Sequence, residues 1–309
     1  MSDVRKAWFG SLAIPLMPFD EKDRIEEDVY AAEIEFCIGA GARGIPVPMM
    51  VSEYDMLSEA ERRMVVQTAV EVAKRRVPVI ANCTAPNRAT AMAYAGFAAE
   101  HGAAAVIALA KSGVHPDFES LFDYYAGIAH AAGGLPVIIQ DHDFASIPVD
   151  WLIRLCTEIP NVNWIKEEVM PTERRITEIL ARRCPHIHGV MGGYGGIRLI
   201  TEWERGARAW IHACDLCDVL QHLCELLDAG RMAEAGDVFE KMLVVLTMEG
   251  MGGLEAAKEI LVRRGVFRNH ACRWRKKEFD AHFRWEFDRA FARIEPYLRW
   301  PAIKRGAAK

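Results

Sequence analysis

The 309-residue sequence lacks several features that would place it in large classes of proteins. No uninterrupted apolar run reaches the roughly 18 residues that a membrane span needs, and residues 1–9 contain no apolar segment typical of a secretory signal. The net charge of −5 provides no field that attracts nucleic acid, and lysine and arginine form no dense stripe before the last few residues. We therefore expect a cytoplasmic protein that binds neither nucleic acid nor membranes.

A disulfide framework, a low-complexity linker and an internal repeat are also missing. The eight cysteines are scattered along the chain without the spacing of a small secreted domain, so most of them are predicted to be core residues. The composition, 51% hydrophobic and 26% charged, is that of an ordinary globular protein. A core of useful size can therefore form without disulfides or metal.

Short apolar runs rich in β-branched residues alternate with longer segments of helical period. This alternation is typical of parallel strands joined by crossover helices. Eight such runs indicate a closed (β/α)8 TIM barrel, with its functional face at the carboxyl ends of the strands. The predicted strands cover residues 11–16, 44–48, 78–82, 104–109, 137–140, 163–166, 187–191 and 208–212.

The rest of the sequence is predicted to be mainly helical. Ser58 and Glu61 form a capping box, and Gly41 and Gly102 stand where helices commonly end. We expect the barrel core over residues 1–215, and the last barrel helix with a C-terminal helical extension over 216–309. The predicted helices cover 26–39, 58–75, 88–101, 119–132, 149–158, 172–183, 196–204, 216–229, 232–248, 254–264 and 278–293.

The sixth predicted strand ends in a lysine, Lys166. Period-two alternation directs Val162, Trp164 and Lys166 to the same side, toward the barrel interior if Trp164 is a core residue. Burial disfavours the ammonium form of a lysine, so a neutral amine becomes available to attack a carbonyl. The alternative is a structural lysine paired with Glu167 or Glu168, and the local sequence does not separate the two.

Several motifs carry a family resemblance over about residues 9–265. They are Gly10-Ser11 with Pro18-Phe19, residues 44–57 with Ser52-Glu53, residues 78–82, and Ile165-Lys166-Glu167. In these motifs the chain resembles the dihydrodipicolinate synthase and N-acetylneuraminate lyase family of class I aldolases and dehydratases. The resemblance implies that Lys166 forms a Schiff base with a small 2-oxo acid, that no cofactor or metal is needed, and that the protein is a homo-oligomer, a tetramer or a dimer.

The departures from the family pattern are also informative. The synthases of this family use a threonine and a tyrosine to move protons, and the corresponding positions here are Met50, Val51 and Gln140. The arginine that binds the substrate carboxylate in the synthases has no counterpart in residues 143–146. The resemblance therefore argues against a dihydrodipicolinate synthase.

A narrower resemblance is to the L-2-keto-3-deoxyarabonate dehydratases. It rests on residues 139–141, Lys166 with Glu168, residues 252–265 and residues 296–300. The loop at residues 111–116 departs from the pattern of that branch. The resemblance implies dehydration of a 2-keto-3-deoxy sugar acid.

Other groups are predicted to assist Lys166. Glu168 would share the face of Lys166 if the strand continues, which makes it the candidate for proton transfer, although an exposed loop carboxylate is equally consistent. The remaining candidates are substrate-binding groups. Gln140 would hold the substrate with its amide, and Asp141 would orient Gln140. Ser52 and Glu53 would lie near the substrate, and for Glu53 the alternative is that it braces the loop. Gly192 and Gly193 would present N–H groups to an anion or form a plain turn.

Three alternatives stay open at this point. A pyruvate-releasing aldolase would share the imine but break the C3–C4 bond, and a non-catalytic relative would only bind a 2-oxo acid or act as a regulator. A metal site would use residues 212–217 with His222 and Cys224, or residues 141–143, although these lie largely on a predicted strand and helix rather than on turns. The aromatic residues of the C-terminal extension fit either core packing or a subunit interface.

Overall fold

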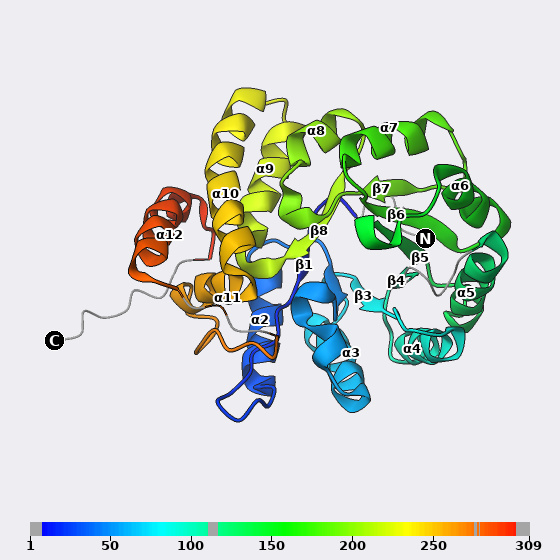
Figure 1. Cartoon of the computed structure of the whole chain (residues 1–309), viewed down its shortest axis with the longest axis horizontal. Coiled ribbons are helices and arrows are strands. Elements are labelled where there is room, and N and C mark those ends of the chain that lie inside the picture. Colours follow the sequence, from blue (N-terminus) through cyan, green and yellow to red (C-terminus); the bar gives the residue numbers. More distant parts are fainter. Residues whose placement is uncertain (1–7, 111–116, 275–276, 278, 301–309) are drawn as a thin grey trace.

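The computed structural model describes residues 8–110, 117–274, 277 and 279–300, so the loop at 111–116 lies outside the described residues. Within them, parallel strands form a barrel that is surrounded by helices (Figure 1). β1 pairs with β8, and β2 to β7 pair in order. Bridges from Leu12 to Gly44 and from Gly192 to Trp210 link the two sheets and close the barrel. The strands are β1 Gly10–Ile14, β2 Ile45–Val47, β3 Val79–Asn82, β4 Ala105–Leu109, β5 Val137–His142, β6 Val162–Glu168, β7 Gly189–Met191 and β8 Ala209–Ala213.

Every predicted strand and helix is present with its bounds shifted by a few residues at most, so the predicted fold is confirmed. Ser58 and Glu61 form the predicted capping box, and Gly41 and Gly102 adopt positive φ after the ends of α2 and α4. The helices are α2 Glu27–Gly39, α3 Glu59–Ala73, α4 Arg88–Glu100, α5 Phe118–Ala131, α6 Val149–Glu158, α7 Thr172–Ala181, α8 Leu199–Glu204, α9 Cys217–Asp228, α10 Met232–Gly252, α11 Leu254–Arg263 and α12 Ala281–Ile294.

Apolar side chains pack in two separate layers. A smaller cluster that includes Leu12, Ile107 and Trp164 fills the barrel, while a larger one lies between the strands and the helices. The expectation that Val162 faces the interior with Trp164 is wrong. The pairing of β5 with β6 shifts register at Val162, so Val162 joins the outer cluster and strict alternation begins only at Trp164.

The C-terminal helices pack one on another outward from the barrel: α10 packs on α9 and α11, and α12 packs on α10. In Figure 1, α10 lies beside α9, and α11 lies near the carboxyl end of β8. Two fully buried ion pairs hold this region: Lys258 of α11 with Glu53 at 2.7 Å, and Arg264 with Asp218 at 2.5 Å. Arg264 also donates to the backbone carbonyl of Asp215. The extension therefore fixes the loops that follow β2 and β8.

The cysteines follow the expectation for core residues. All except the half-buried Cys184 are buried, and all are free thiols. Among the described residues, no helix is both long and apolar enough to cross a membrane.

Candidate active site

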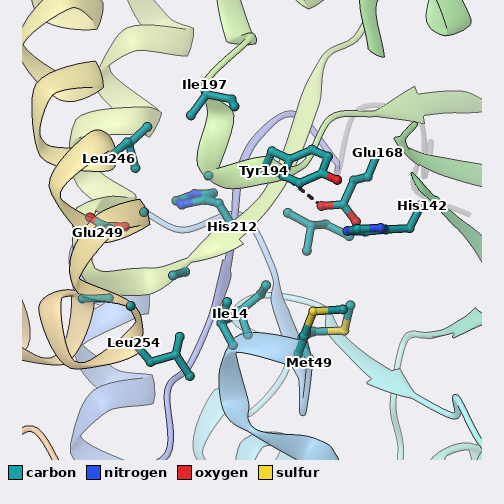
Figure 2. Close-up of a pocket in the computed structure, with 18 of the residues that line it drawn as sticks. Ile14, Met49, His142, Glu168, Tyr194, Ile197, His212, Leu246, Glu249 and Leu254 are labelled. Atoms are coloured by element: carbon teal, nitrogen blue, oxygen red, sulfur yellow. Dashed lines mark hydrogen bonds between the residues drawn. The ribbon is translucent and has the colours of Figure 1, made fainter. Parts of the chain in front are cut away.

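A cavity of about 650 Å³ opens at the carboxyl ends of the strands. Lys166 and Glu168 of β6, Gln140 of β5 and His212 of β8 enter it from the barrel, and α10 and α11 form one of its walls (Figure 2). This is the end of a (β/α)8 barrel at which active sites are built. The cavity therefore coincides with the site that the position of Lys166 predicts.

Lys166 and Glu168 form a buried ion pair in this cavity. The Nζ atom of Lys166 lies 2.8 Å from Oε2 of Glu168, and the two residues are only 4% and 5% exposed. β6 continues through Glu168, so both side chains extend from the same face of one strand. Both alternatives considered for the lysine thus apply in part: it is paired with a carboxylate, and it also lines a cavity.

Glu168 is held by three donors. Besides Lys166, the side-chain amide of Gln140 donates to its Oε2 at 2.8 Å, and the backbone N–H of Tyr194 donates to its Oε1 at 3.0 Å. Burial alone would raise the pKa of this carboxyl, but the charge and the hydrogen bond of Lys166, with the hydrogen bond from the Tyr194 amide, outweigh it and hold the pKa below its usual value. Glu168 is therefore a buried, ionised carboxylate with a fixed orientation rather than an exposed loop carboxylate.

The two predicted glycines make room for this arrangement and do not line the cavity. A Cβ on Gly193 would overlap the Glu168 carboxylate, and one on Gly192 would overlap the side chains of Glu202 and Trp210. The anion that the glycine loop binds is Glu168 of the protein itself, through the Tyr194 amide. The Gly192 N–H donates to the carbonyl of Ala209 at 2.9 Å, so it is not available to an anion, whereas anion binding by the Gly193 N–H stays a prediction.

Asp141 is turned away from the cavity. It pairs with Arg175 of α7, and its Oδ1 accepts the backbone N–H of Ile147 at 2.8 Å. Because neighbouring strand residues point to opposite faces, Asp141 and Glu167 face the helices while Gln140 and Glu168 face the interior. Burial and then the Asp141 charge raise the pKa of Glu167 to about 9. The expected contact of Asp141 with the substrate is thus replaced by a role in the outer layer.

Ser52 and Glu53 brace the loop after β2, a role considered for Glu53 but not for Ser52. The hydroxyl of Ser52 donates to the carbonyl of Pro15 at 2.6 Å and accepts the N–H of Met49 at 3.1 Å. Glu53 binds Lys258 and accepts the N–H of Trp274 at 2.7 Å. Both side chains are fully buried and neither lines the cavity, whereas their neighbours Met50 and Val51 do.

The cavity contains further polar groups that sequence reasoning did not assign to the substrate. His142 lies beside the ring of Tyr194, with the ring centroids 5.2 Å apart. His212 is buried and its Nε2 lies 2.8 Å from the hydroxyl of Ser11. Burial lowers the pKa of His212 to about 4, so its ring is neutral near pH 7. Each histidine lies at or just beyond the end of a predicted strand, which is a signal for a place in the active-site cavity. From the sequence, both histidines are considered only as metal ligands.

The residues proposed for a metal site lie apart. His212 enters the cavity, whereas Cys214, Cys217 and Cys224 belong to the apolar core. In the part of the chain that the structure describes, no three histidine, cysteine, aspartate or glutamate side chains form a group suited to a metal ion.

Fold and cavity together define a class of protein. It is a (β/α)8 barrel whose sixth strand presents a buried lysine, paired with a carboxylate, to a cavity at the carboxyl ends of the strands. This arrangement is suited to forming an imine with a carbonyl compound. The chain belongs to the dihydrodipicolinate synthetase family, whose model matches residues 7–278. This is a family of class I aldolases and lyases that use a lysine Schiff base with 2-oxo acids.

The relatives carry different names. L-2-keto-3-deoxyarabonate dehydratase from Azospirillum brasilense is 24% identical over 295 residues, which cover 93% of this chain and 95% of that protein. A probable 5-dehydro-4-deoxyglucarate dehydratase from Bacillus subtilis is 31% identical over 169 residues, and the match spans about half of each protein, 55% and 54%. Dihydrodipicolinate synthase from Rhodopseudomonas palustris has a similar structure, with a TM-score of 0.85 at 23% identity over 93% of this chain and 98% of that one.

Proposed function

We propose that the protein is a Schiff-base lyase in which Lys166 forms an imine with C2 of a small 2-oxo acid. The observation that carries the proposal is the buried pair of Lys166 and Glu168 in the cavity at the barrel mouth. Such a pair can exchange one proton internally, which yields a neutral amine and a carboxylic acid without changing the net charge of the site. The amine then attacks the carbonyl carbon.

Glu168 is proposed as the group that moves protons in this reaction. It takes one proton from the Lys166 ammonium, and after the amine attacks, the nitrogen passes a second proton to the carbonyl oxygen. Glu168 then returns the first proton to the same oxygen, which leaves C2 as water, and a protonated imine remains. The ionised carboxylate then removes a proton from C3, and the electrons of that C–H bond form the enamine. This role replaces the threonine and tyrosine of the synthases, whose positions are occupied by Met50, Val51 and Gln140.

The finer proposal is dehydration of a 2-keto-3-deoxy sugar acid that resembles L-2-keto-3-deoxyarabonate. The enamine electrons expel the C4 hydroxyl, which leaves as water with the proton that Glu168 gained from C3. Support comes from the relative of that name, which aligns over almost the whole chain. A pyruvate-releasing aldolase is the second candidate, because the same enamine chemistry in reverse breaks the C3–C4 bond.

Gln140 is proposed to link the substrate to Glu168. Its amide already donates to Glu168 and also lines the cavity. An amide offers both a donor and an acceptor and does not titrate, so it can bind a substrate hydroxyl at any pH.

Product analysis tests the proposal. The protein is incubated with L-2-keto-3-deoxyarabonate and the products are identified by NMR, with Lys166→Ala as the control. Dehydration predicts a product that has lost one water and no release of pyruvate. Release of pyruvate would support the aldolase, and equal turnover by Lys166→Ala would contradict the imine mechanism.

A further inference from the structure

Two adjacent acids lie across the cavity from Glu168. Glu249 of α10 lines the main cavity, and together with Asp215 it borders a small adjoining one of about 10 Å³. Figure 2 shows Glu249 on the wall that also carries Leu246 and Leu254, with His212 between this wall and Glu168. Asp215 is 1% exposed. The lyase mechanism above uses neither acid.

The two carboxyls must share a proton. Oδ2 of Asp215 and Oε1 of Glu249 are both enclosed and lack a hydrogen-bond partner in the described structure, so the contact between the two acids is favourable only if one oxygen is protonated. Burial, followed by the charge of Asp215, raises the pKa of Glu249 well above its usual value. Burial raises the pKa of Asp215 to about 6. At neutral pH the pair therefore holds one proton and one negative charge.

Among the residues that the structure describes, no cation pairs with the carboxylates of Asp215 and Glu249. The nearby Arg264 donates to both carboxylate oxygens of Asp218 and reaches Asp215 only at its backbone carbonyl. His212 is neutral, as shown above. Two lysines line the cavity. The amine of Lys277 donates to the carbonyl of Met251 at 2.7 Å, and the amine of Lys166 pairs with Glu168.

Apolar side chains flank Glu249, and another acid of this wall, Glu255 of α11, accepts the backbone N–H of Lys277 at 2.7 Å. Leu246, Leu254 and Ile197 surround Glu249 on the cavity side (Figure 2). Among these apolar side chains, Glu249 offers a substrate a hydrogen-bonding position. A second carboxylate at that position would meet the negative charge of the pair in a poorly solvated site.

We propose that Glu249, oriented by Asp215, determines specificity at the far end of the substrate: it binds a hydroxyl beyond C4 and excludes 2-oxo acids that carry a second carboxylate there. This inference rests on the proposed function, because it assumes that the 2-oxo end of the substrate is bound at Lys166. Glu249 would thus favour a substrate whose far end carries an uncharged hydroxyl over an aldarate, whose far end carries a carboxylate.

Two substrates and two variants test the inference. Values of kcat/KM are measured for L-2-keto-3-deoxyarabonate and for the dicarboxylate 5-dehydro-4-deoxyglucarate. Glu249→Leu removes the hydrogen bond, and the double variant Asp215→Asn/Glu249→Gln removes the charge while keeping the shapes. Glu240→Gln, on the exposed side of the same helix, is the matched control. Exchange of the pyruvate C3 protons with solvent reports the Lys166 site without the distal contacts.

The wild type and the Glu240→Gln variant should favour the monocarboxylate by ~100-fold, because facing like charges cost several kcal/mol. Glu249→Leu should lower kcat/KM for the monocarboxylate ~10-fold more than it lowers pyruvate exchange, the usual effect of one lost hydrogen bond. The double variant should reduce the preference at least ~10-fold. Equal use of both acids by the wild type, or equal losses on both readouts in Glu249→Leu, would overturn the inference. Absence of pyruvate exchange in the wild type would instead refute the proposed function.

Discussion

Replacing Glu168 with glutamine separates imine formation from proton transfer. The substitution keeps the size of the side chain and one oxygen that can accept the Tyr194 N–H, while its new NH2 group can donate to the amide oxygen of Gln140 once Gln140 rotates. It removes the base and the negative charge 2.8 Å from Lys166. Loss of a positioned general base lowers a rate by ~10²–10⁴, which corresponds to about 3–5 kcal/mol in the barrier. The enamine step should slow by this factor.

Pyruvate provides an assay that does not depend on the natural substrate. An enzyme that forms the imine and then the enamine exchanges the C3 protons of pyruvate with deuterium from D2O, which proton NMR follows directly. We expect exchange by Glu168→Gln to fall ~10²–10⁴-fold. Borohydride should still trap some of this variant as an adduct, because Lys166 retains its amine.

Glu167→Gln is the matched control for this experiment. Glu167 is the adjacent residue and equally buried, but it faces Arg175 and the outer layer. Its raised pKa of about 9 means that it is mostly protonated near neutral pH, a state that glutamine imitates. Exchange should therefore persist in Glu167→Gln. If Glu168→Gln exchanged as fast as the wild type, Glu168 would not be the base.

Three further predictions follow from the packing around the site. Gly193→Ala should displace the Glu168 carboxylate, which a Cβ would overlap, and lower pyruvate exchange at least ~10-fold, whereas unchanged exchange would contradict the close approach. Lys258→Met should lower the free energy of unfolding, measured in urea, by ~3–5 kcal/mol, because it leaves the fully buried Glu53 without its partner. The double variant Glu53→Gln/Lys258→Met should recover part of this loss, and equal stability of the single and double variants would contradict the prediction. Burial raises the pKa of Glu33 from 4.5 to about 8, so between these pH values Glu33 is ionised in the unfolded chain and protonated in the folded one. The free energy of unfolding should therefore fall by ~1.4 kcal/mol per pH unit as the pH rises through this range. Glu33→Gln should remove this contribution, and an identical pH dependence of the wild type and the variant would refute the prediction.

The sequence was sufficient to predict the barrel because each strand is a short apolar run and each helix has its own period and caps. Alternation also places Glu168 on the same face as Lys166 if the strand continues, whereas the ion pair itself was open between Glu167 and Glu168. Alternation should likewise have placed Asp141 outside, because it is one residue from Gln140 on the same strand.

Contacts between distant segments were not predictable in this way. That Gly193 accommodates Glu168 depends on how closely the loop after β7 approaches β6. The presence of Glu249 in the cavity depends on the packing of α10 against the barrel, and an isolated helical sequence gives no signal of that packing. The homo-oligomer expected from the family resemblance stays a prediction.

The central claim, an imine at Lys166, is tested most directly by mass spectrometry of the intact protein after incubation with pyruvate and borohydride. The wild type should gain one reduced pyruvate, peptide mapping should locate it on Lys166, and Lys166→Ala should gain none. No adduct on the wild type with pyruvate or with a 2-keto-3-deoxy acid, or an adduct that persists in Lys166→Ala, would contradict the account.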